Sequence, residues 1–168
     1  TRAEVALDQK RKEKIALFCN VSPERVISAP DVDSIYDVPI NYEKDGLGDT
    51  LCDVLGLAKQ PTDLAEWEAF VRKVKGAARE VNIAVVGKYT SNGDAYMSIE
   101  EALKHGGIAH DARVHIEWIE SDTLEEPGLK LAERFASTDG LIVAPGFGPR
   151  GVEGKIGATK FARESGLP

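Results

Sequence analysis

The sequence predicts an α/β fold in which parallel strands alternate with helices that cover the sheet. Two segments, Val81–Val86 and Asp139–Val143, are largely apolar, as in strands that are buried on both faces. A third segment, Ala112–Ile119, alternates between apolar and polar residues with the period of a strand. Segments with apolar residues at helical spacing follow each strand, and this order indicates a parallel sheet that binds ligands at the carboxyl ends of its strands.

Composition excludes several classes of protein. The chain has 168 residues, which suits one domain, or one domain with part of another, at roughly 100–200 residues each. It is 42% hydrophobic and 29% charged, which argues against disorder, collagen, coiled coil and membrane spans. The net charge of −7 opposes non-specific binding to nucleic acid or to anionic membranes, so we expect neither as a partner.

The two cysteines, Cys19 and Cys52, have no spacing typical of metal or redox motifs, and we assign no metal ligands. Cys19 lies in an apolar run, which predicts a small buried thiol. The chain begins with charged residues rather than with the apolar core of a signal peptide. We therefore expect a cytoplasmic protein.

Before residue 81 the pattern changes from strands to helices. After a charged segment up to Lys12, the apolar run Lys14–Val21 predicts a buried strand. Ser22 and Pro23 then predict a helical turn, and Ser34–Val38 predicts another short strand. Apolar residues at helical spacing predict two helices between residues 41 and 80, the second with Asp63 as a candidate cap, followed by a connector over residues 76–80.

The second half continues with regular alternation. Its three strands are expected at residues 81–86, 112–119 and 139–143, and its helices at 94–105, 127–135 and 152–164. Gly106 and Gly107 predict the end of the first of these helices. A fourth strand is expected to begin near Pro168, so we expect the domain to continue beyond it.

The glycine-rich segment Gly146–Gly151 follows the third strand of this half. It matches the G-x-G-x-x-G dinucleotide fingerprint, but no later strand carries the ribose-binding acid, which disfavours that interpretation. Glycines also let successive backbone N–H groups point into one concavity and stabilise a developing oxyanion. Arg150 would add a positive charge for a phosphate or carboxylate. A tight turn with a solvated arginine is the structural alternative.

Two further groups could bind a nucleotide. Lys88 and Tyr89 follow the strand 81–86 and should lie at the same edge of the sheet as Gly146, although a plain loop surface would give the same pattern. In the first half, Lys14 could contact a phosphate and the Asp31–Val32 backbone could contact a base. A strand-end lysine and an ordinary turn are the alternatives there.

Six motifs in order and spacing resemble the CTP synthase family along nearly the whole chain. They are Lys14–Val21, Asp31–Tyr36, Val86–Tyr89, Asp94–Tyr96, Ile99–Gly107 and Gly146–Gly154. The resemblance implies the end of an α/β amidoligase domain at residues 1–40 and a helical interdomain linker at 41–80. It implies the N-terminal half of a flavodoxin-like glutamine amidotransferase domain at 81–168.

This resemblance implies a glutamine-dependent ligase that converts UTP, ATP and glutamine to CTP, ADP, phosphate and glutamate. It implies Mg²⁺ and ATP in the parent enzyme, GTP as an activator, no covalently bound cofactor, and a homotetramer. UTP or CTP, ATP, GTP and glutamine would be the ligands.

The resemblance also implies roles for individual residues. Gly146 and Phe147 would bind glutamine and form the oxyanion hole, and Lys14 would contact UTP or CTP. The ATP side would be formed by Arg2, Pro30, Asp31 and Val32. The neighbourhood of GTP activation would contain Lys88, Tyr89, Arg150, Gly151 and Glu153.

The chain departs from the family at two positions. Pro145 replaces a glycine of the family's loop and removes one backbone donor, and Pro30 stands where a lysine is common. We expect the nucleophilic cysteine beyond Pro168 and the phosphate-binding loop before Thr1, so the chain alone should be inactive. A non-catalytic flavodoxin-like module that binds a nucleotide or a partner remains the main alternative, and a dinucleotide-dependent oxidoreductase a weaker one.

Overall fold

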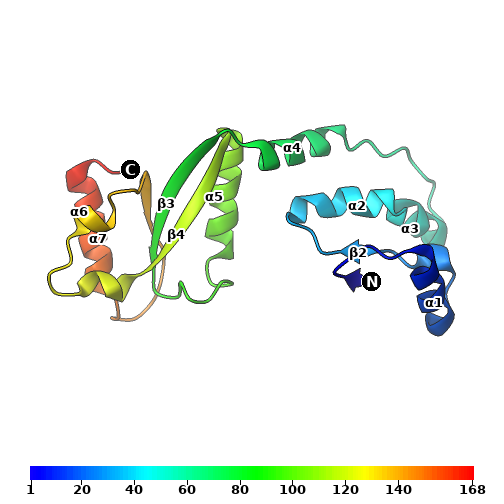
Figure 1. Cartoon of the computed structure of the whole chain (residues 1–168), viewed down its shortest axis with the longest axis horizontal. Helices are drawn as coiled ribbons and strands as arrows, with labels where there is room; N and C mark the ends of the chain where they lie inside the picture. The colour runs from blue at the N-terminus through cyan, green and yellow to red at the C-terminus, as the bar shows by residue number, and fades with distance from the viewer. The chain divides into compact units, whose positions relative to one another are not determined.

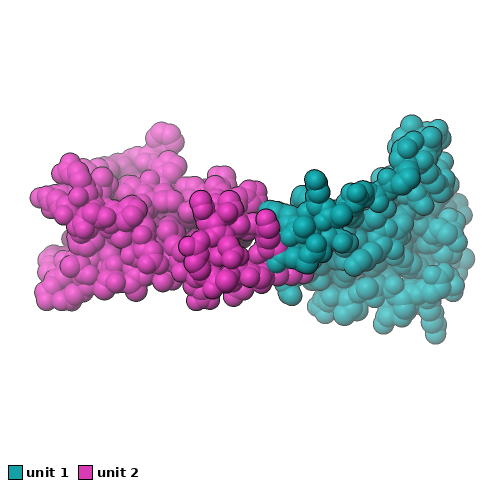
Figure 2. All heavy atoms as spheres, turned by 90° about the horizontal axis from the view of Figure 1, so that it is seen from above, with its two compact units in different colours: residues 1–72 teal, residues 73–168 magenta.

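The computed structural model describes all residues from 1 to 168, which form two compact units (Figure 2). Unit 1 comprises residues 1–72 and unit 2 comprises residues 73–168. The boundary falls inside helix α4 (Ala65–Gly76). Residues 41–80, expected to form a linker, are thus divided between the two units.

Unit 1 is mainly helical. Its elements are β1 (Arg2–Ala3), α1 (Gln9–Cys19), a 3₁₀ turn (Pro23–Arg25), β2 (Ala29–Pro30), a second 3₁₀ turn (Ile35–Asp37), α2 (Val38–Lys44), α3 (Leu47–Leu55) and the beginning of α4 (Figure 1). Strands β1 and β2 pair in parallel, with Arg2 opposite Ala29. The turn at Pro23 and the capping role of Asp63, which accepts a hydrogen bond from the Ala65 N–H at 2.9 Å, confirm two of the predictions.

The buried strand expected at Lys14–Val21 is wrong, because these residues belong largely to helix α1. The Asp8 carboxylate caps this helix by accepting from the Arg11 N–H at 2.8 Å, and Asn20 ends it in the left-handed conformation. Only Ala16 of the helix is buried, whereas Leu17 and Phe18 are 78% and 79% exposed. Cys19 is exposed as well, so the expected buried thiol is also wrong.

The short strand expected at Ser34–Val38 is wrong for a local reason. The Ser34 hydroxyl accepts a hydrogen bond from the Tyr36 N–H at 3.3 Å and starts a 3₁₀ turn. Pro39 then occupies the first turn of α2, where its missing N–H costs nothing. The proline therefore begins a helix here instead of ending a strand.

A carboxylate holds three parts of unit 1 together. Asp45, which follows α2, forms an ion pair with Lys12 of α1 and accepts from the Ser28 N–H at 2.6 Å. Burial alone would raise the pKa of Asp45, but the hydrogen bonds from Lys12 and Ser28 outweigh burial and lower it. The Ser28 hydroxyl accepts in turn from the Leu7 N–H at 2.9 Å.

Unit 2 contains a three-stranded parallel sheet in the order β4–β3–β5. Its elements are β3 (Arg79–Gly87), α5 (Met97–Ala109), β4 (Ala112–Glu120), a 3₁₀ turn (Ser121–Glu125), α6 (Leu131–Arg134), β5 (Gly140–Val143) and α7 (Val152–Ser165). The α/β class, the parallel sheet and all three strands of this half are confirmed. Ile83 pairs with Ile116 on one side and with Gly140 on the other.

Helices cover both faces of this sheet (Figure 1). Ala84 and Val86 of β3 point toward α7 and share a buried cluster with Ala158. Val85, the residue between them, points to the opposite face and clusters with Tyr96 and Ala144, with Leu103 of α5 packed against them. The central strand is therefore buried on both faces, as its largely apolar sequence predicts.

Two helices of unit 2 differ from their predicted lengths. Helix α5 continues past Gly106 and Gly107 to Ala109, because Gly107 lets the helix approach β4: a Cβ atom there would lie 2.5 Å from the Ala112 carbonyl oxygen. The helix expected at 127–135 is reduced to Leu131–Arg134, since the Leu129 N–H bonds to the Glu126 carbonyl and forms a turn instead. None of the helices is long and apolar enough to cross a membrane.

Candidate functional site

The carboxyl ends of the three parallel strands bring several predicted site residues together. Strand β3 ends at Gly87 and is followed by Lys88, β4 ends at Glu120, and β5 leads into residues 144–151. The Lys88 ammonium donates a hydrogen bond to the Phe147 carbonyl at 3.0 Å and a second one to the Gly148 carbonyl. This contact confirms that Lys88 lies at the same edge as the glycine-rich segment.

Residues 144–148, which we call the donor loop, include two adjacent backbone N–H groups that have no protein partner. Among the 168 residues, no protein group accepts a hydrogen bond from the N–H of Gly146 or from that of Phe147. The Phe147 side chain is 95% exposed, so it contributes little to the packing of the loop. Two adjacent N–H groups without a protein partner can receive hydrogen bonds from an anionic ligand.

Side chains hold the carbonyl groups of the donor loop instead. Lys155 of α7 donates to the Ala144 carbonyl at 2.7 Å, and the Tyr96 hydroxyl donates to the Pro145 carbonyl at 2.9 Å. Together with the two bonds from Lys88, four of the five carbonyls of the loop are bonded to side chains. Only the Gly146 carbonyl has no such partner. After the backbone bond from the Ala144 N–H to the Val86 carbonyl at 2.9 Å, the loop is held by side-chain donors.

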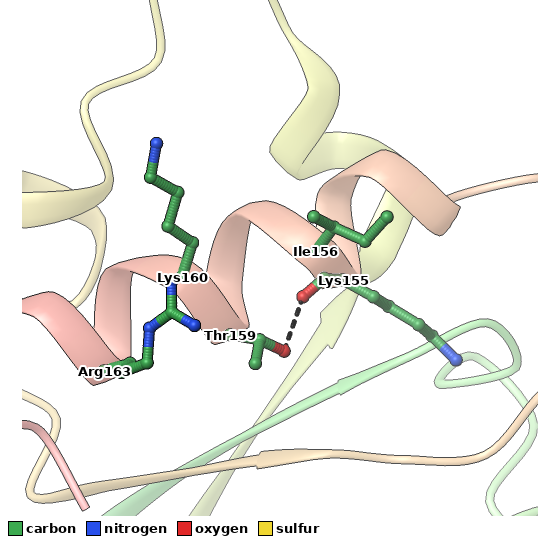
Figure 3. Close-up of a pocket in the computed structure, with 5 residues that line it drawn as sticks. All are labelled: Lys155, Ile156, Thr159, Lys160 and Arg163. Carbon is green, nitrogen blue, oxygen red and sulfur yellow. Dashed lines mark hydrogen bonds between the residues drawn. The ribbon is translucent and has the colours of Figure 1, made fainter.

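Two ammonium groups lie next to Gly146. An ideal Cβ atom on this glycine would lie 3.0 Å from Cδ of Lys88 and 3.3 Å from Nζ of Lys155. Burial, and next the charge of Lys88, lower the pKa of Lys155. Figure 3 shows the Lys155 side chain extending from α7 toward the green segment after β3. Lys155 also lines a 330 Å³ hollow on this helix, together with Ile156, Thr159, Lys160 and Arg163.

Lys88 is not a plain loop residue, because it is only 2% exposed. Its side chain is used inside the protein, whereas neighbouring Tyr89 is 45% exposed and free to meet a ligand. Gly151 is buried at the start of α7, and Glu153 is exposed in the first turn of that helix. The residues assigned to GTP activation thus lie around one edge of unit 2, with different degrees of access to solvent.

Arg150 pairs with two carboxylates at the surface, where its side chain is 53% exposed, so it is solvated but not free of protein partners. Its guanidinium bonds to Asp122 at 2.8 Å and to Glu120 at 3.3 Å, and it also donates to the Lys88 carbonyl. Glu120 accepts from the Thr90 N–H and the Thr90 hydroxyl, each at 2.8 Å. Burial alone would raise the pKa of Glu120, but these hydrogen bonds outweigh it and keep the pKa below its ordinary value.

In unit 1, the four residues assigned to the ATP side line one cavity of about 600 Å³. These residues are Arg2, Pro30, Asp31 and Val32, and Ala29, Ile35, Val38 and Tyr42 complete the lining. The Arg2 guanidinium bonds to the Asp31 carboxylate at 2.9 Å, and the Asp31 N–H bonds to the Ala3 carbonyl at 3.0 Å. The parallel pairing of β1 and β2 places these distant residues side by side.

The structure does not bring Lys14 to this cavity. Lys14 lies exposed on α1 and is not among the residues that line the cavity. The lysine of α1 that is partly buried is Lys12, which is paired with Asp45. The assignment of Lys14 to UTP or CTP therefore stays a prediction from resemblance.

Sequence reasoning missed three residues that shape the edge of unit 2. Glu120 could have been found, because it ends a strand in the same way as Gly87 and Val143. Lys155 and Tyr96 gave no such signal. Each acts through a hydrogen bond to a carbonyl, and Tyr96 is 49 residues away from its acceptor in the sequence.

Two family models match separate parts of the chain. The model "CTP synthase N-terminus" matches residues 1–57. The model "Glutamine amidotransferase class-I" matches residues 93–168, which include the donor loop. The two matches follow each other in the order that the resemblance implies.

Relatives that share one name align with almost all of the chain. A CTP synthase of Symbiobacterium thermophilum is 48% identical over 170 residues, which cover 99% of this chain and 31% of that protein. One of Thermococcus gammatolerans is 47% identical over 167 residues, again covering 99% and 31%. A solved structure, "Trypanosoma brucei CTPS - glutaminase domain with bound acivicin", is 40% identical and covers 52% of this chain and 34% of that one, with a TM-score of 0.48.

The chain thus spans about a third of the length of the relatives it matches. These matches support the CTP synthase interpretation and not the alternative of a separate non-catalytic binding module. The two family models and the near-complete alignment with relatives of one name show that this chain matches a segment of the CTP synthases over almost its whole length.

Proposed function

We propose that this chain is the part of a CTP synthase that supplies the oxyanion donors of glutamine hydrolysis and one wall of an ATP site. The full-length enzyme would convert UTP, ATP and glutamine to CTP, ADP, phosphate and glutamate. The observation that carries this proposal is the pair of unpartnered N–H groups at Gly146 and Phe147, next to the ammonium groups of Lys88 and Lys155.

Glutamine hydrolysis requires these donors at the step that forms an oxyanion. When a thiolate attacks the side-chain amide carbon of glutamine, the carbonyl oxygen becomes an oxyanion. The N–H groups of Gly146 and Phe147 would donate to this oxygen, and the nearby lysines would make the local potential positive. The amide nitrogen then takes up a proton and leaves as ammonia, which gives a thioester. Water hydrolyses this thioester to glutamate and free thiol.

The thiol itself is not supplied by this chain. Cys19 and Cys52 both belong to unit 1 and have free thiols. Because oxyanion donors only assist a nucleophile, the isolated chain should release no ammonia from glutamine above background. Release by the purified 168-residue chain, at a rate proportional to its concentration, would contradict this expectation.

In unit 1, we propose that the cavity lined by Arg2, Pro30, Asp31 and Val32 accepts the adenine side of ATP. The cavity offers apolar walls for a base and a few polar groups at its rim, which is the usual composition of a nucleotide site. Mg²⁺ would accompany ATP in the parent enzyme. No cluster of three or more His, Cys, Asp or Glu side chains occurs among the 168 residues, so we assign no magnesium ligand to them.

The remaining partners follow from the same match to CTP synthases. We propose UTP or CTP near Lys14, GTP as an activator near Lys88, Tyr89, Arg150, Gly151 and Glu153, and a homotetramer in the cytoplasm. For GTP, exposed Tyr89 offers an aromatic surface for the base. The phosphates would have to share Arg150 with Asp122 and Glu120.

Gly146→Ala in the full-length protein tests the proposed function. Its methyl group would lie 3.0 Å from the Lys88 side chain and 3.3 Å from the Lys155 ammonium, so it would displace the loop or its lysines. We expect CTP formation from glutamine to fall about 100-fold, the lower end of the range of roughly 100–1000-fold for loss of one oxyanion donor. CTP formation from added ammonia should stay within about twofold of wild type, because it needs no oxyanion donor.

The matched control is Gly157→Ala in α7, whose methyl group would lie 3.8 Å from Leu131, at an ordinary contact distance. This variant should keep both activities. If Gly146→Ala also kept its glutamine-dependent activity, or if the wild-type protein hydrolysed no glutamine, the proposed function would be wrong.

A further inference from the structure

The Tyr96 hydroxyl links two segments at the edge of unit 2. It donates to the Pro145 carbonyl at 2.9 Å and accepts from the Lys88 N–H at 3.0 Å. Both bonds are well inside the normal range for hydrogen bonds, and the Tyr96 side chain is only 5% exposed. The hydroxyl is therefore fully used inside the protein, as both a donor and an acceptor.

The ring of Tyr96 is held as firmly as its hydroxyl. It stacks on Trp118 of β4 with ring centroids 5.7 Å apart and an interplanar angle of 12°. It also packs in the buried cluster of Val85 and Ala144. An ideal Cβ atom on Gly87 would lie 2.7 Å from the Tyr96 ring, so the last residue of β3 leaves just enough space for it. Because the ring is packed on several sides, the position of its hydroxyl is fixed.

The bond to Pro145 sets the direction of the next N–H group. In a trans peptide the carbonyl of one residue and the N–H of the next point in opposite directions, and this chain has no cis peptide bond. Since the Pro145 carbonyl points toward Tyr96 in the core, the Gly146 N–H must point away from the core. The Ala144 N–H is bonded to the Val86 carbonyl and the proline at 145 has no N–H, so Gly146 supplies the first N–H of the loop that is open to a ligand.

We propose that Tyr96 is a positioning residue, which orients the Gly146 N–H toward the oxyanion of glutamine hydrolysis without touching the substrate. This inference rests on the proposed function, because it assigns the orientation of a donor that the proposed function requires. Without the hydroxyl, the Pro145–Gly146 peptide loses its anchor, and it can rotate so that the N–H leaves the oxyanion.

Tyr96→Phe in the full-length protein tests this role, because it removes one oxygen atom and keeps the packed ring. We expect kcat for glutamine hydrolysis to fall about tenfold, less than for a complete loss of the donor, with KM within about twofold. CTP formation from added ammonia should be unchanged. A split of this kind shows a donor needed in the transition state, whereas a merely structural role would reduce both activities together with the melting temperature.

The matched control is Ser165→Ala, which also removes one hydroxyl from unit 2. The Ser165 hydroxyl donates to the Phe161 carbonyl within α7 at 2.8 Å and does not contact the donor loop. This variant should keep kcat and KM within about twofold of wild type.

A second variant keeps the test decisive if Tyr96→Phe unfolds. Gly87→Ala retains the hydroxyl but displaces it, because the new methyl group would lie 2.9 Å from the hydroxyl oxygen and 2.7 Å from the ring. It should give the same loss of kcat with the same KM. An unchanged kcat in whichever of the two variants folds would overturn the role of Tyr96, while wild-type glutamine hydrolysis would leave the proposed function intact.

Discussion

Ser121 lies so close to α7 that Gly154 has no space for a side chain. A Cβ atom on this glycine would lie 1.8 Å from the Ser121 carbonyl oxygen, a backbone atom that cannot rotate away. Ser121 follows β4 directly and is 1% exposed. This one contact therefore sets how closely α7 approaches the strand ends that carry the candidate site.

Gly154→Ala should for this reason destabilise the full-length protein. We expect the free energy of unfolding of the domain that contains α7 to fall by about 3 kcal/mol, the cost of overpacking where neighbouring atoms cannot move away. Urea denaturation followed by circular dichroism measures the change. Gly157→Ala, on the same helix but in open contact, should instead be stabilising by about 0.5–1 kcal/mol, from helix propensity alone. Equal effects of the two substitutions would show that α7 is not held by this contact.

The hydrogen bonds of Asp45 belong to the scale of whole elements, because one carboxylate joins α1, α2 and the segment that enters β2. Its pKa is lowered in the folded protein, so the folded state binds a proton less readily than the unfolded state. The stabilisation is therefore present at neutral pH and is lost as the pH falls through the lowered pKa, below the ordinary aspartate range near 3.9.

Asp45→Asn should remove this pH-dependent contribution. At pH 7 we expect the variant to be less stable than wild type by about 1 kcal/mol, typical of hydrogen bonds to a charged group with partial solvent access. The difference should shrink as the pH is lowered toward 3, which thermal melts across the pH series would show. Asp49→Asn is the control, because Asp49 is 68% exposed and lies 3.9 Å from Lys59. A difference that stayed constant with pH would exclude the ion pair as its origin.

Elements of unit 2 could be predicted from the sequence, whereas several of unit 1 could not. The second half of strand β3, Ile83–Val86, is continuously apolar because helices cover both of its faces within the same unit, so its pattern and its burial agree. The run Lys14–Val21 has a similar pattern, yet Leu17 and Phe18 have no cover in unit 1. There the Asp8 cap and the left-handed Asn20 decide for a helix.

In the candidate site, too, some contacts could be predicted from the sequence and others could not. The meeting of Lys88 with the donor loop could be predicted, because parallel strands end at a common edge. The hydrogen bonds from Tyr96 and Lys155 to carbonyl groups could not be predicted. They depend on the directions of peptide planes and on side-chain conformations, which no repeating pattern in the sequence reports.

At the scale of the whole molecule, unit 1 contains a segment between helices α3 and α4 that is open to proteases. Residues 57–63 form no helix or strand and are exposed. Lys59 bonds to Asp53 at 2.9 Å and is 46% exposed, so its ion pair leaves the backbone accessible. We expect limited trypsin digestion of the full-length protein to cut this chain first after Lys59, which mass spectrometry of the fragments would identify.

The control for this site is Lys59→Gln. This variant should lose the first cut and keep the cuts at the other trypsin sites. Lys104, which lies in α5 and pairs with Glu100 at 2.7 Å, should be cut later, because a packed helix must open before a protease can bind it. Initial cleavage after Lys104 instead would mean that helix α5 of unit 2 opens more readily than residues 57–63 of unit 1 are cut.

The dependence of the donor loop on earlier residues bears on how the protein is made. Lys88 and Tyr96 precede their acceptors in the loop by 49 to 60 positions, so a ribosome synthesises both of them long before those acceptors. By the time residues 145–148 leave the exit tunnel, β3 and the residues after it are already free to receive them. The loop can therefore take its final shape during translation, and only the hydrogen bond from Lys155, seven residues after residue 148, has to form later.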